Sequence, residues 1–131
     1  MVHVDTAIRP GALRLSFQGQ LDMTAEGAFN EALTRATRFG RRVEIDLGEV
    51  DFIDGSGLSL LIDAERRARR SGRQLTIIDA SKPVHRLIEI TGTADRLPPL
   101  DTSESRLLTA GVDMPGEIVA RRALAGAGRV G

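Results

Sequence analysis

The sequence contains no cysteine, tryptophan or tyrosine, and only four of its 131 residues are phenylalanine. The absence of cysteine excludes disulfides and thiolate metal sites. The shortage of aromatic rings removes most of the side chains on which nucleic-acid bases stack. The 18 basic and 18 acidic residues cancel, whereas nucleic-acid-binding domains normally carry a basic excess. No nucleic-acid partner is therefore expected.

Long apolar runs are also missing from the chain. No segment approaches the roughly 20 apolar residues of a membrane helix. The first residues, Met1 to Asp5, lack the basic stretch and apolar run of a signal peptide. We therefore expect a cytoplasmic protein without membrane insertion, and its length predicts one domain with its own core.

Alternating apolar residues predict four strands, at residues 2–8, 13–17, 43–47 and 74–79. Pro10-Gly11 separates the first two strands, which indicates a hairpin. Leu97 to Leu100 would add a fifth, short strand, which Pro98 and Pro99 confine to an edge of the sheet.

Three amphipathic helices are expected between and after these strands. The first starts near Asp22 or Thr24, ends at Gly40, and buries Ala25, Ala28, Phe29, Ala32, Leu33 and Ala36. The second follows Ser56 and buries Gly57, Leu60, Leu61, Ala64 and Ala68. The third runs from Val84 to Thr91. Strands joined through helices favour parallel pairing, so we expect a single α/β domain with a mixed four- to five-stranded sheet and helices packed against it.

The last part of the chain differs from the rest. Residues 101–131 include five glycines and no aromatic residue. Short helices are conceivable from Asp101 to Leu108 and from Pro115 to Leu124, but neither has enough apolar surface to fold alone. We expect a domain over residues 1–100 and a marginally ordered tail over 101–131, so that deleting residues 108–131 leaves thermal stability nearly unchanged.

The segment from Glu49 to Leu60 carries the most specific signal. It follows a strand, contains an acidic loop, and places Ser56 between Gly55 and Gly57 at the start of a helix. Serine at this position is a common helix cap, worth about 1 kcal/mol. It is also an accessible place for a phosphate, which a helix N-terminus tolerates. The residues alone leave both interpretations open.

Several catalytic and ligand-binding interpretations fit the residues less well. Asp22 and Asp54 would form a carboxylate pair, but His3 and His85 lie on elements far from them in sequence, and the Gly-x-Ser-x-Gly string of hydrolases is absent. The acidic residues from Asp46 to Asp54 do not have calcium-loop spacing. Gly55 to Gly57 lacks the lysine of a phosphate-binding loop. We expect no enzyme, cofactor or metal site.

Four motifs in order resemble the STAS domain family, which includes the bacterial anti-anti-sigma factors. They are Gly19-Gln-Leu-Asp22 followed by Thr24, Asp54-Gly-Ser-Gly57, Arg73 to Val84, and Val84 to Gly92. Together they cover roughly residues 2–100. The family often has Asp-Ser-Ser-Gly where this chain has Asp54-Gly-Ser-Gly57, and the second serine, the family's phosphoacceptor, is retained as Ser56.

The resemblance implies a partner-switching regulator, an anti-sigma factor antagonist. It would bind an anti-sigma factor serine kinase and be switched off by phosphorylation of Ser56. The alternative is a STAS subunit that does not switch, for example in a lipid-transport ATPase complex. The residues expected at the partner-binding face are Asp22, Thr24, Asp51, Asp54, Gly55, Gly57, Leu58 and Ile62. Of these, Leu58 and Ile62 form a second apolar edge of their helix, which would face either the core or a partner.

Overall fold

The computed structural model describes residues 1–40 and 42–101. The elements follow one another as β1 (Val2–Arg9), β2 (Ala12–Leu21), η1 (Met23–Ala25), α1 (Glu26–Thr37), β3 (Arg42–Ile53), α2 (Gly55–Arg70), β4 (Gln74–Ala80), α3 (Lys82–Thr91) and η2 (Ala94–Arg96). Both η elements are short 3-10 helices. Among the described helices, none is long and apolar enough to cross a membrane.

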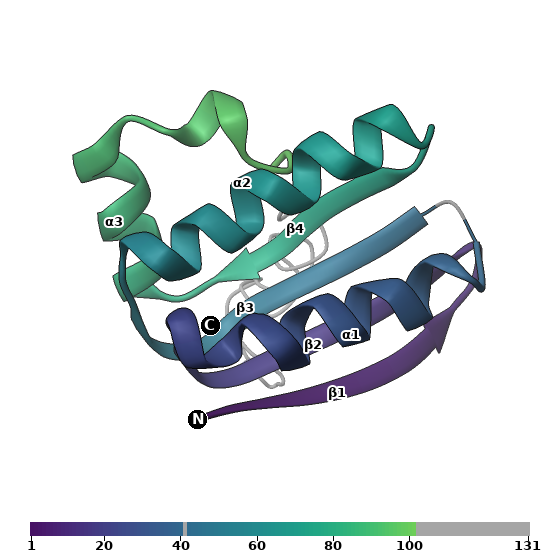
Figure 1. Cartoon of the computed structure of the whole chain (residues 1–131), viewed down its shortest axis with the longest axis horizontal. Helices are drawn as coiled ribbons and strands as arrows, with labels where there is room; N and C mark the ends of the chain where they lie inside the picture. Colours follow the sequence, from purple (N-terminus) through teal and green to yellow (C-terminus); the bar gives the residue numbers. More distant parts are fainter. Residues whose placement is uncertain (41, 102–131) are drawn as a thin grey trace, which may run out of the picture.

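The sheet is mixed and has the order β1-β2-β3-β4 (Figure 1). β1 and β2 pair antiparallel, as the predicted hairpin requires, and Gly11 in the turn has a φ of 75°, which glycine adopts without strain. β2 pairs with β3 and β3 with β4 in parallel. The predicted α/β class, mixed sheet and helical crossovers are confirmed.

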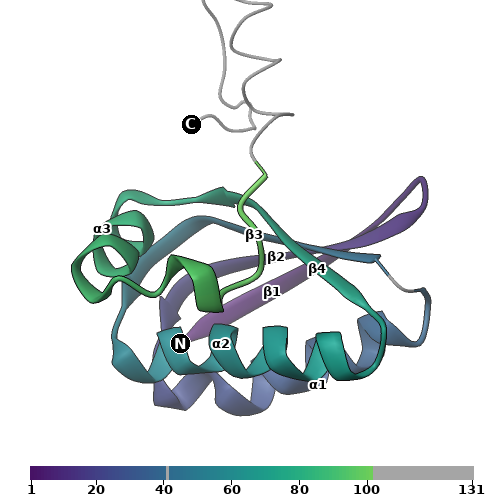
Figure 2. The same ribbon diagram turned by 90° about the horizontal axis from the view of Figure 1, so that it is seen from above.

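Helices α1 and α2 cover one face of the sheet, and α3 lies at the end where β3 and β4 finish (Figure 2). The core lies between this helical layer and the inward side chains of the strands. Its largest fully buried members include Phe17, Leu15, Ile45 and Leu61. Phe17 of β2 meets Phe29 of α1 with ring centroids 5.2 Å apart. Burying each such side chain contributes about 1.5–3 kcal/mol.

The predicted fifth strand is present only as a bridge of one residue. Leu100 pairs in parallel with Ile77 of β4. The Ile77 N–H donates to the Pro99 carbonyl at 2.8 Å, and the Asp101 N–H donates to the Ile77 carbonyl at 2.7 Å. Proline lacks the N–H that a longer ladder needs. Apart from Asp101, the predicted tail over residues 101–131 and its two short helices lie outside the described residues.

The predicted acidic loop before Ser56 is wrong, because β3 continues to Ile53. The buried residues of β3 first alternate at Val43, Ile45 and Leu47, and then fall at Val50 and Ile53. Two register shifts between β2 and β3 cause this change of phase. A β-bulge adds a residue to one strand and so moves later side chains to the other face, which hides the strand from a search for strict alternation.

The helix faces agree with prediction except at their margins. Ala28 was expected to be buried but is exposed, because the buried stripe of α1 runs through Phe29, Ala32, Leu33 and Ala36 and leaves Ala28 on its flank. Leu60 is only half-buried. α3 is closed by Gly92 at a φ of 64°, as its position after the helix predicts.

Candidate functional site

The ends of β2 and β3 bring the two predicted aspartates together. Leu21 and Ile53 are partners in the parallel register, so the next residues, Asp22 and Asp54, leave the sheet side by side. Parallel strands end at the same edge of a sheet, and this edge commonly carries function in α/β folds. The two aspartates that the sequence suggested as a carboxylate pair therefore lie at one end of the sheet.

Asp54 organises the start of α2. One carboxylate oxygen, Oδ1, accepts from the Ser56 N–H at 3.0 Å, the Ser56 hydroxyl at 2.6 Å and the Gly57 N–H at 3.1 Å. Asp54 has an extended backbone and is the N-cap residue. The interpretation of Ser56 as the cap is therefore wrong: Ser56 is the second residue of the helix and donates to the cap.

These contacts stabilise the charged form of Asp54. The Ser56 hydroxyl, followed by the Gly57 N–H, lowers the pKa of Asp54 below the ordinary value of 3.8. Asp54 is thus a carboxylate at neutral pH, and it fixes the direction of the Ser56 O–H bond. Ser56 is half-exposed at the N-terminus of a 16-residue helix, where an added anion meets the positive end of the helix dipole.

Asp22 makes a second turn of the same kind. Its Oδ1 accepts from the Thr24 N–H at 2.9 Å and the Thr24 hydroxyl at 2.5 Å, and it caps η1. Thr24 is exposed. The edge of the sheet therefore carries two aspartate–hydroxyl pairs, one after each of two neighbouring strands. The sequence contains this repetition as Asp-x-Thr and Asp-x-Ser, but only the strand register places the two together.

Two of the predicted partner-contacting residues are buried. Gly57 has no room for a side chain, because a Cβ there would overlap the Leu21 carbonyl oxygen and lie 2.7 Å from the Leu21 carbonyl carbon. Leu58 is 4% exposed and belongs to the core. The prediction that these two residues contact a partner directly is wrong, because Gly57 seats α2 on the end of β2 and Leu58 faces inward.

The other predicted contact residues differ in accessibility. Asp51 and Gly55 are exposed, and nothing lies within 4 Å of the place that a Cβ of Gly55 would occupy. Ile62 is half-buried and lines a groove with Glu65, Arg66, Arg69, Asp95 and Arg96. The groove is bordered by η2. Ile62 lies six residues, and so more than one helical turn, after Ser56 in α2, and it does not join the aspartates at the strand ends.

Among the described residues, neither histidine is hydrogen-bonded to Ser56. The Ser56 hydroxyl donates to an aspartate, whereas His3 contacts Asp5 on β1 at 3.2 Å and His85 lies exposed on α3. A serine nucleophile needs an adjacent base to accept its proton, usually histidine. In residues 1–40 and 42–101, no three His, Asp or Glu side chains are arranged to hold a metal ion.

Sequence reasoning missed two exposed apolar residues beside the aspartates. Met23 follows Asp22 directly and is 72% exposed, and Phe52 stands two residues before Asp54 and is 47% exposed. Phe52 is one of four phenylalanines in the chain and was hidden inside the segment interpreted as an acidic loop. The sequence does contain a signal for them, because each is a large apolar residue within two positions of a candidate site aspartate.

Comparison with known proteins agrees with this arrangement. The family profile described as the STAS domain matches residues 3–106. This chain belongs to the STAS domain family. Its members named anti-sigma factor antagonist are generally regulators without catalysis.

Individual relatives of this STAS domain share modest identity with it. The anti-sigma-B factor antagonist of Staphylococcus aureus (strain NCTC 8325 / PS 47) is 26% identical over 95 residues, which cover 72% of this chain and 88% of the relative. The crystal structure of an anti-sigma factor antagonist from Mycobacterium paratuberculosis has a TM-score of 0.68 at 22% identity and covers 84% of this chain and 93% of its own.

The same fold occurs in the Bacillus cell fate determinant SpoIIAA, whose structure is known in a phosphorylated form. The TM-score is 0.58 at 14% identity, over 80% of this chain and 96% of SpoIIAA. At these identities the two solved structures establish the fold, which is the predicted one.

Proposed function

We propose that this STAS domain is an anti-sigma factor antagonist that binds an anti-sigma factor serine kinase and is released when Ser56 is phosphorylated. The supporting observation is Ser56, which is half-exposed in the first turn of α2 and whose hydroxyl donates a hydrogen bond to Asp54. The S. aureus relative is named for antagonism of an anti-sigma factor, which supports the proposed class of partner.

Phosphorylation reverses the chemistry at the Asp54 turn. The Ser56 hydroxyl donates to the Asp54 carboxylate, and a phosphate ester has no proton to donate from that oxygen. A phosphoserine instead brings about 1.5–2 negative charges and three acceptor oxygens. The hydrogen bond becomes a repulsion between anions, so the phosphoserine side chain turns away from Asp54 toward the surface that a partner occupies.

The accessible part of the docking face is acidic. It comprises Asp22, Thr24, Asp51, Asp54 and Gly55 around Ser56. A kinase surface that complements these carboxylates carries arginine or lysine side chains. A phosphate adds negative charge to a face that is already negative. Removing water from this charge costs free energy in a contact that fits a neutral hydroxyl. The unmodified protein therefore binds and the phosphorylated protein is released.

Mass spectrometry locates the phosphate in the first test. The protein is incubated with ATP and each anti-sigma factor kinase encoded in the genome of origin. We expect one phosphate on Ser56 and none on Ser59, Ser103 or Ser105, the last two of which lie outside the described residues. Ser59→Ala is the matched control, because it removes an exposed serine hydroxyl of α2 that is not among the docking residues, and it is expected to keep the phosphate on Ser56. Phosphate on another residue contradicts the proposal.

Titration of the same kinase measures the switch. Ser56→Ala is expected to bind like the wild type, since a methyl group adds no charge. Ser56→Asp is expected to weaken binding about tenfold or more, and phospho-Ser56 more strongly still, the scale of an unpaired charge in an interface. Equal affinity of the phosphorylated and free proteins would favour the second function, a STAS subunit that binds an ATPase complex without switching. Purification of the protein with its native partner then separates the two functions, by retaining either a kinase or a transporter ATPase.

A further inference from the structure

Exposed apolar side chains flank the acidic strand ends. Met23 and Phe52 are 72% and 47% exposed, and each lies within two residues of a capping aspartate, Asp22 or Asp54. The register pairs Phe52 with Gln20 and Ile53 with Leu21, which places the two apolar residues on neighbouring chain segments. Large exposed apolar groups beside a polar site commonly mark a protein contact.

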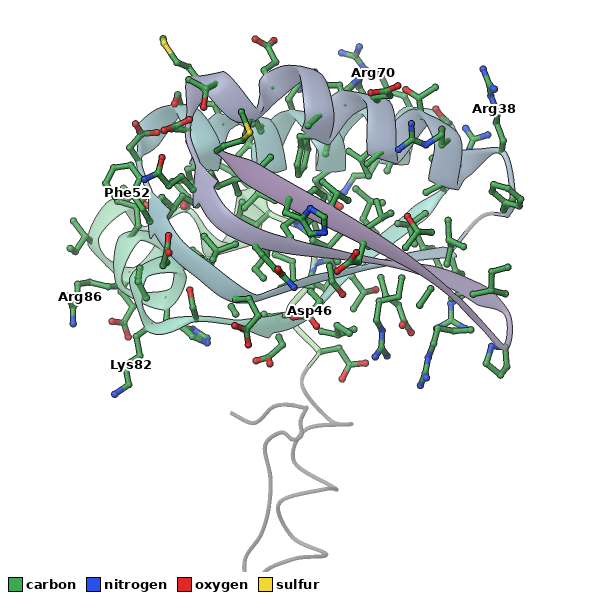
Figure 3. All side chains as sticks on the ribbon, turned by 90° about the horizontal axis from the view of Figure 1, so that it is seen from below. Arg38, Asp46, Phe52, Arg70, Lys82 and Arg86 are labelled. Atoms are coloured by element: carbon green, nitrogen blue, oxygen red, sulfur yellow. The ribbon has the colours of Figure 1, made fainter. Side chains whose placement is uncertain are left out.

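Phe52 is exposed because of its position in the strand. Its neighbour Ile53 points into the core at 7% exposure, so Phe52 points to the opposite side, away from α1 and α2. Figure 3 shows Phe52 at the end of the sheet near α3, far from Arg38 at the other end. The exposed part of the Phe52 ring is available to another molecule, and fully burying a phenylalanine side chain contributes about 1.5–3 kcal/mol.

The carboxylates around these two residues have no cationic partner among residues 1–40 and 42–101. In the described part of the protein, Asp22, Asp51 and Asp54 make no salt bridge with arginine or lysine. The surface therefore combines two apolar side chains with three unpaired negative charges. A complementary surface needs apolar pockets bordered by basic side chains.

We propose that Met23 and Phe52 are the apolar anchors through which this STAS domain holds its anti-sigma factor kinase, on a kinase surface with apolar pockets bordered by arginine or lysine. The inference rests on the proposed function and names the chemistry of its partner. A second copy of this chain does not fit the surface, because a two-fold contact would bring the three aspartates of each copy against those of the other. Like charges at an interface oppose association.

The anchors and the phosphate act on different parts of the binding free energy. Removing an anchor loses apolar contact whether or not Ser56 is modified. Phosphorylation adds charge and leaves both anchors in place. A small number of residues normally supplies most of the affinity of an interface, and aromatic residues are prominent among them. Phe52 is therefore expected to contribute more than Met23.

Titration of four alanine variants against the kinase tests this inference. Phe52→Ala and Met23→Ala are expected to weaken binding about tenfold or more, a typical loss for anchor residues. Phe39→Ala and Ile8→Ala are the controls, since Phe39 and Ile8 are 74% and 82% exposed. Both controls lie at the other end of the molecule, Phe39 beside Arg38 and Ile8 opposite Leu13 at the hairpin. They are expected to bind within about twofold of the wild type.

Two further measurements distinguish the loss of an anchor from the loss of the fold. Thermal unfolding checks that each variant is folded, and Phe52→Leu, which keeps apolar volume, is expected to restore most of the affinity. Wild-type affinity in both Phe52→Ala and Met23→Ala, with release by phospho-Ser56 intact, overturns this inference and leaves the proposed function standing. Failure of the wild type to bind every anti-sigma factor kinase of the genome of origin overturns both.

Discussion

The turn at Asp22 and the turn at Asp54 use the same chemistry in different surroundings. In each, one aspartate oxygen accepts the N–H and the hydroxyl of the residue two positions later, Thr24 or Ser56. After Asp22 the chain enters a three-residue 3-10 helix before α1. After Asp54 it enters α2 directly, and a third donor, the Gly57 N–H, joins the carboxylate.

The difference shows that two hydroxyls bonded to capping aspartates can have different surroundings. Gly57 lies against the carbonyl group of Leu21, and Leu21 is the last residue of β2 before Asp22. The Asp54 turn is thereby seated on the end of the neighbouring strand. Ser56 is half-exposed there, whereas Thr24 is exposed in the short helix η1. The lesson is that a close backbone approach distinguishes two otherwise equivalent turns.

The largest effect is expected from a substitution at Gly57 that prevents this close approach of the two backbones. Gly57→Ala places a methyl group against the Leu21 carbonyl, a backbone atom that cannot move aside, and it is expected to destabilise the protein by about 3 kcal/mol, the upper range for overpacking. Gly55→Ala is the matched control, because nothing lies within 4 Å of its added Cβ. Urea unfolding of both variants measures the difference. Equal stability would show that α2 does not need its seat on β2.

A smaller effect is expected from removing the caps. Asp22→Ala is expected to cost about 1 kcal/mol, as typical for an N-cap. Asp54→Ala is expected to cost more, because its carboxylate serves three donors and that of Asp22 serves two. Thermal unfolding at pH 7 ranks the two variants, with asparagine at each position as the control that keeps an acceptor. The reverse order would contradict the comparison.

The titration of Asp54 tests how strongly the Ser56 hydroxyl stabilises its charged form. The hydroxyl is the largest cause that lowers the pKa of Asp54, so Ser56→Ala is expected to raise that pKa toward 3.8. With a lowered folded pKa, the stabilising contribution of Asp54 is complete above pH 3.8 and is lost as the pH falls through the folded pKa. Carbon-detected NMR titration of wild type and Ser56→Ala measures the shift. Thr24→Ala should leave the titration of Asp54 unchanged.

The smallest effect concerns a third aspartate with the same local hydrogen bond. Asp46 accepts the Gly48 N–H at 2.9 Å, but burial, opposed by that bond, raises the pKa of Asp46 above 3.8, and Asp79 raises it further. A raised folded pKa means that ionisation destabilises the fold as the pH rises above 3.8. Asp46→Asn is therefore expected to be slightly more stable than wild type at pH 7.

The control for Asp46→Asn is the same comparison with the wild type at low pH. Below pH 3.8 both side chains are neutral, so the difference in the free energy of unfolding should disappear. A variant that is less stable at pH 7 would show that the charge of Asp46 is needed, for example by Arg14, whose charge lowers the pKa of Asp46. Figure 3 shows Asp46 on the side of the sheet away from α1 and α2.

Most of the fold was predictable, and the failures share one cause. The hairpin at Pro10-Gly11 and the helices of 26–37 and 55–70 follow from local patterns. The second half of β3 did not, because two register shifts against β2 change which of its side chains point inward. Leu58 was assigned to a partner face for a similar reason: helical periodicity places it at the edge of the buried stripe, and only packing decides the edge.

By itself, the sequence determined the α/β class, the order of the elements, the position of Ser56 at a helix start and the aspartates that precede the two hydroxyls. These features depend on contacts within a few residues, such as the hydrogen bonds between Asp54 and Ser56. Only the tertiary structure decided that Asp22 and Asp54 lie side by side, that Gly57 is pressed against Leu21 and that Phe52 is exposed beside them. Those outcomes depend on the register of β2 with β3, which pairs residues 30 to 32 positions apart in the chain and is therefore beyond the reach of local sequence patterns.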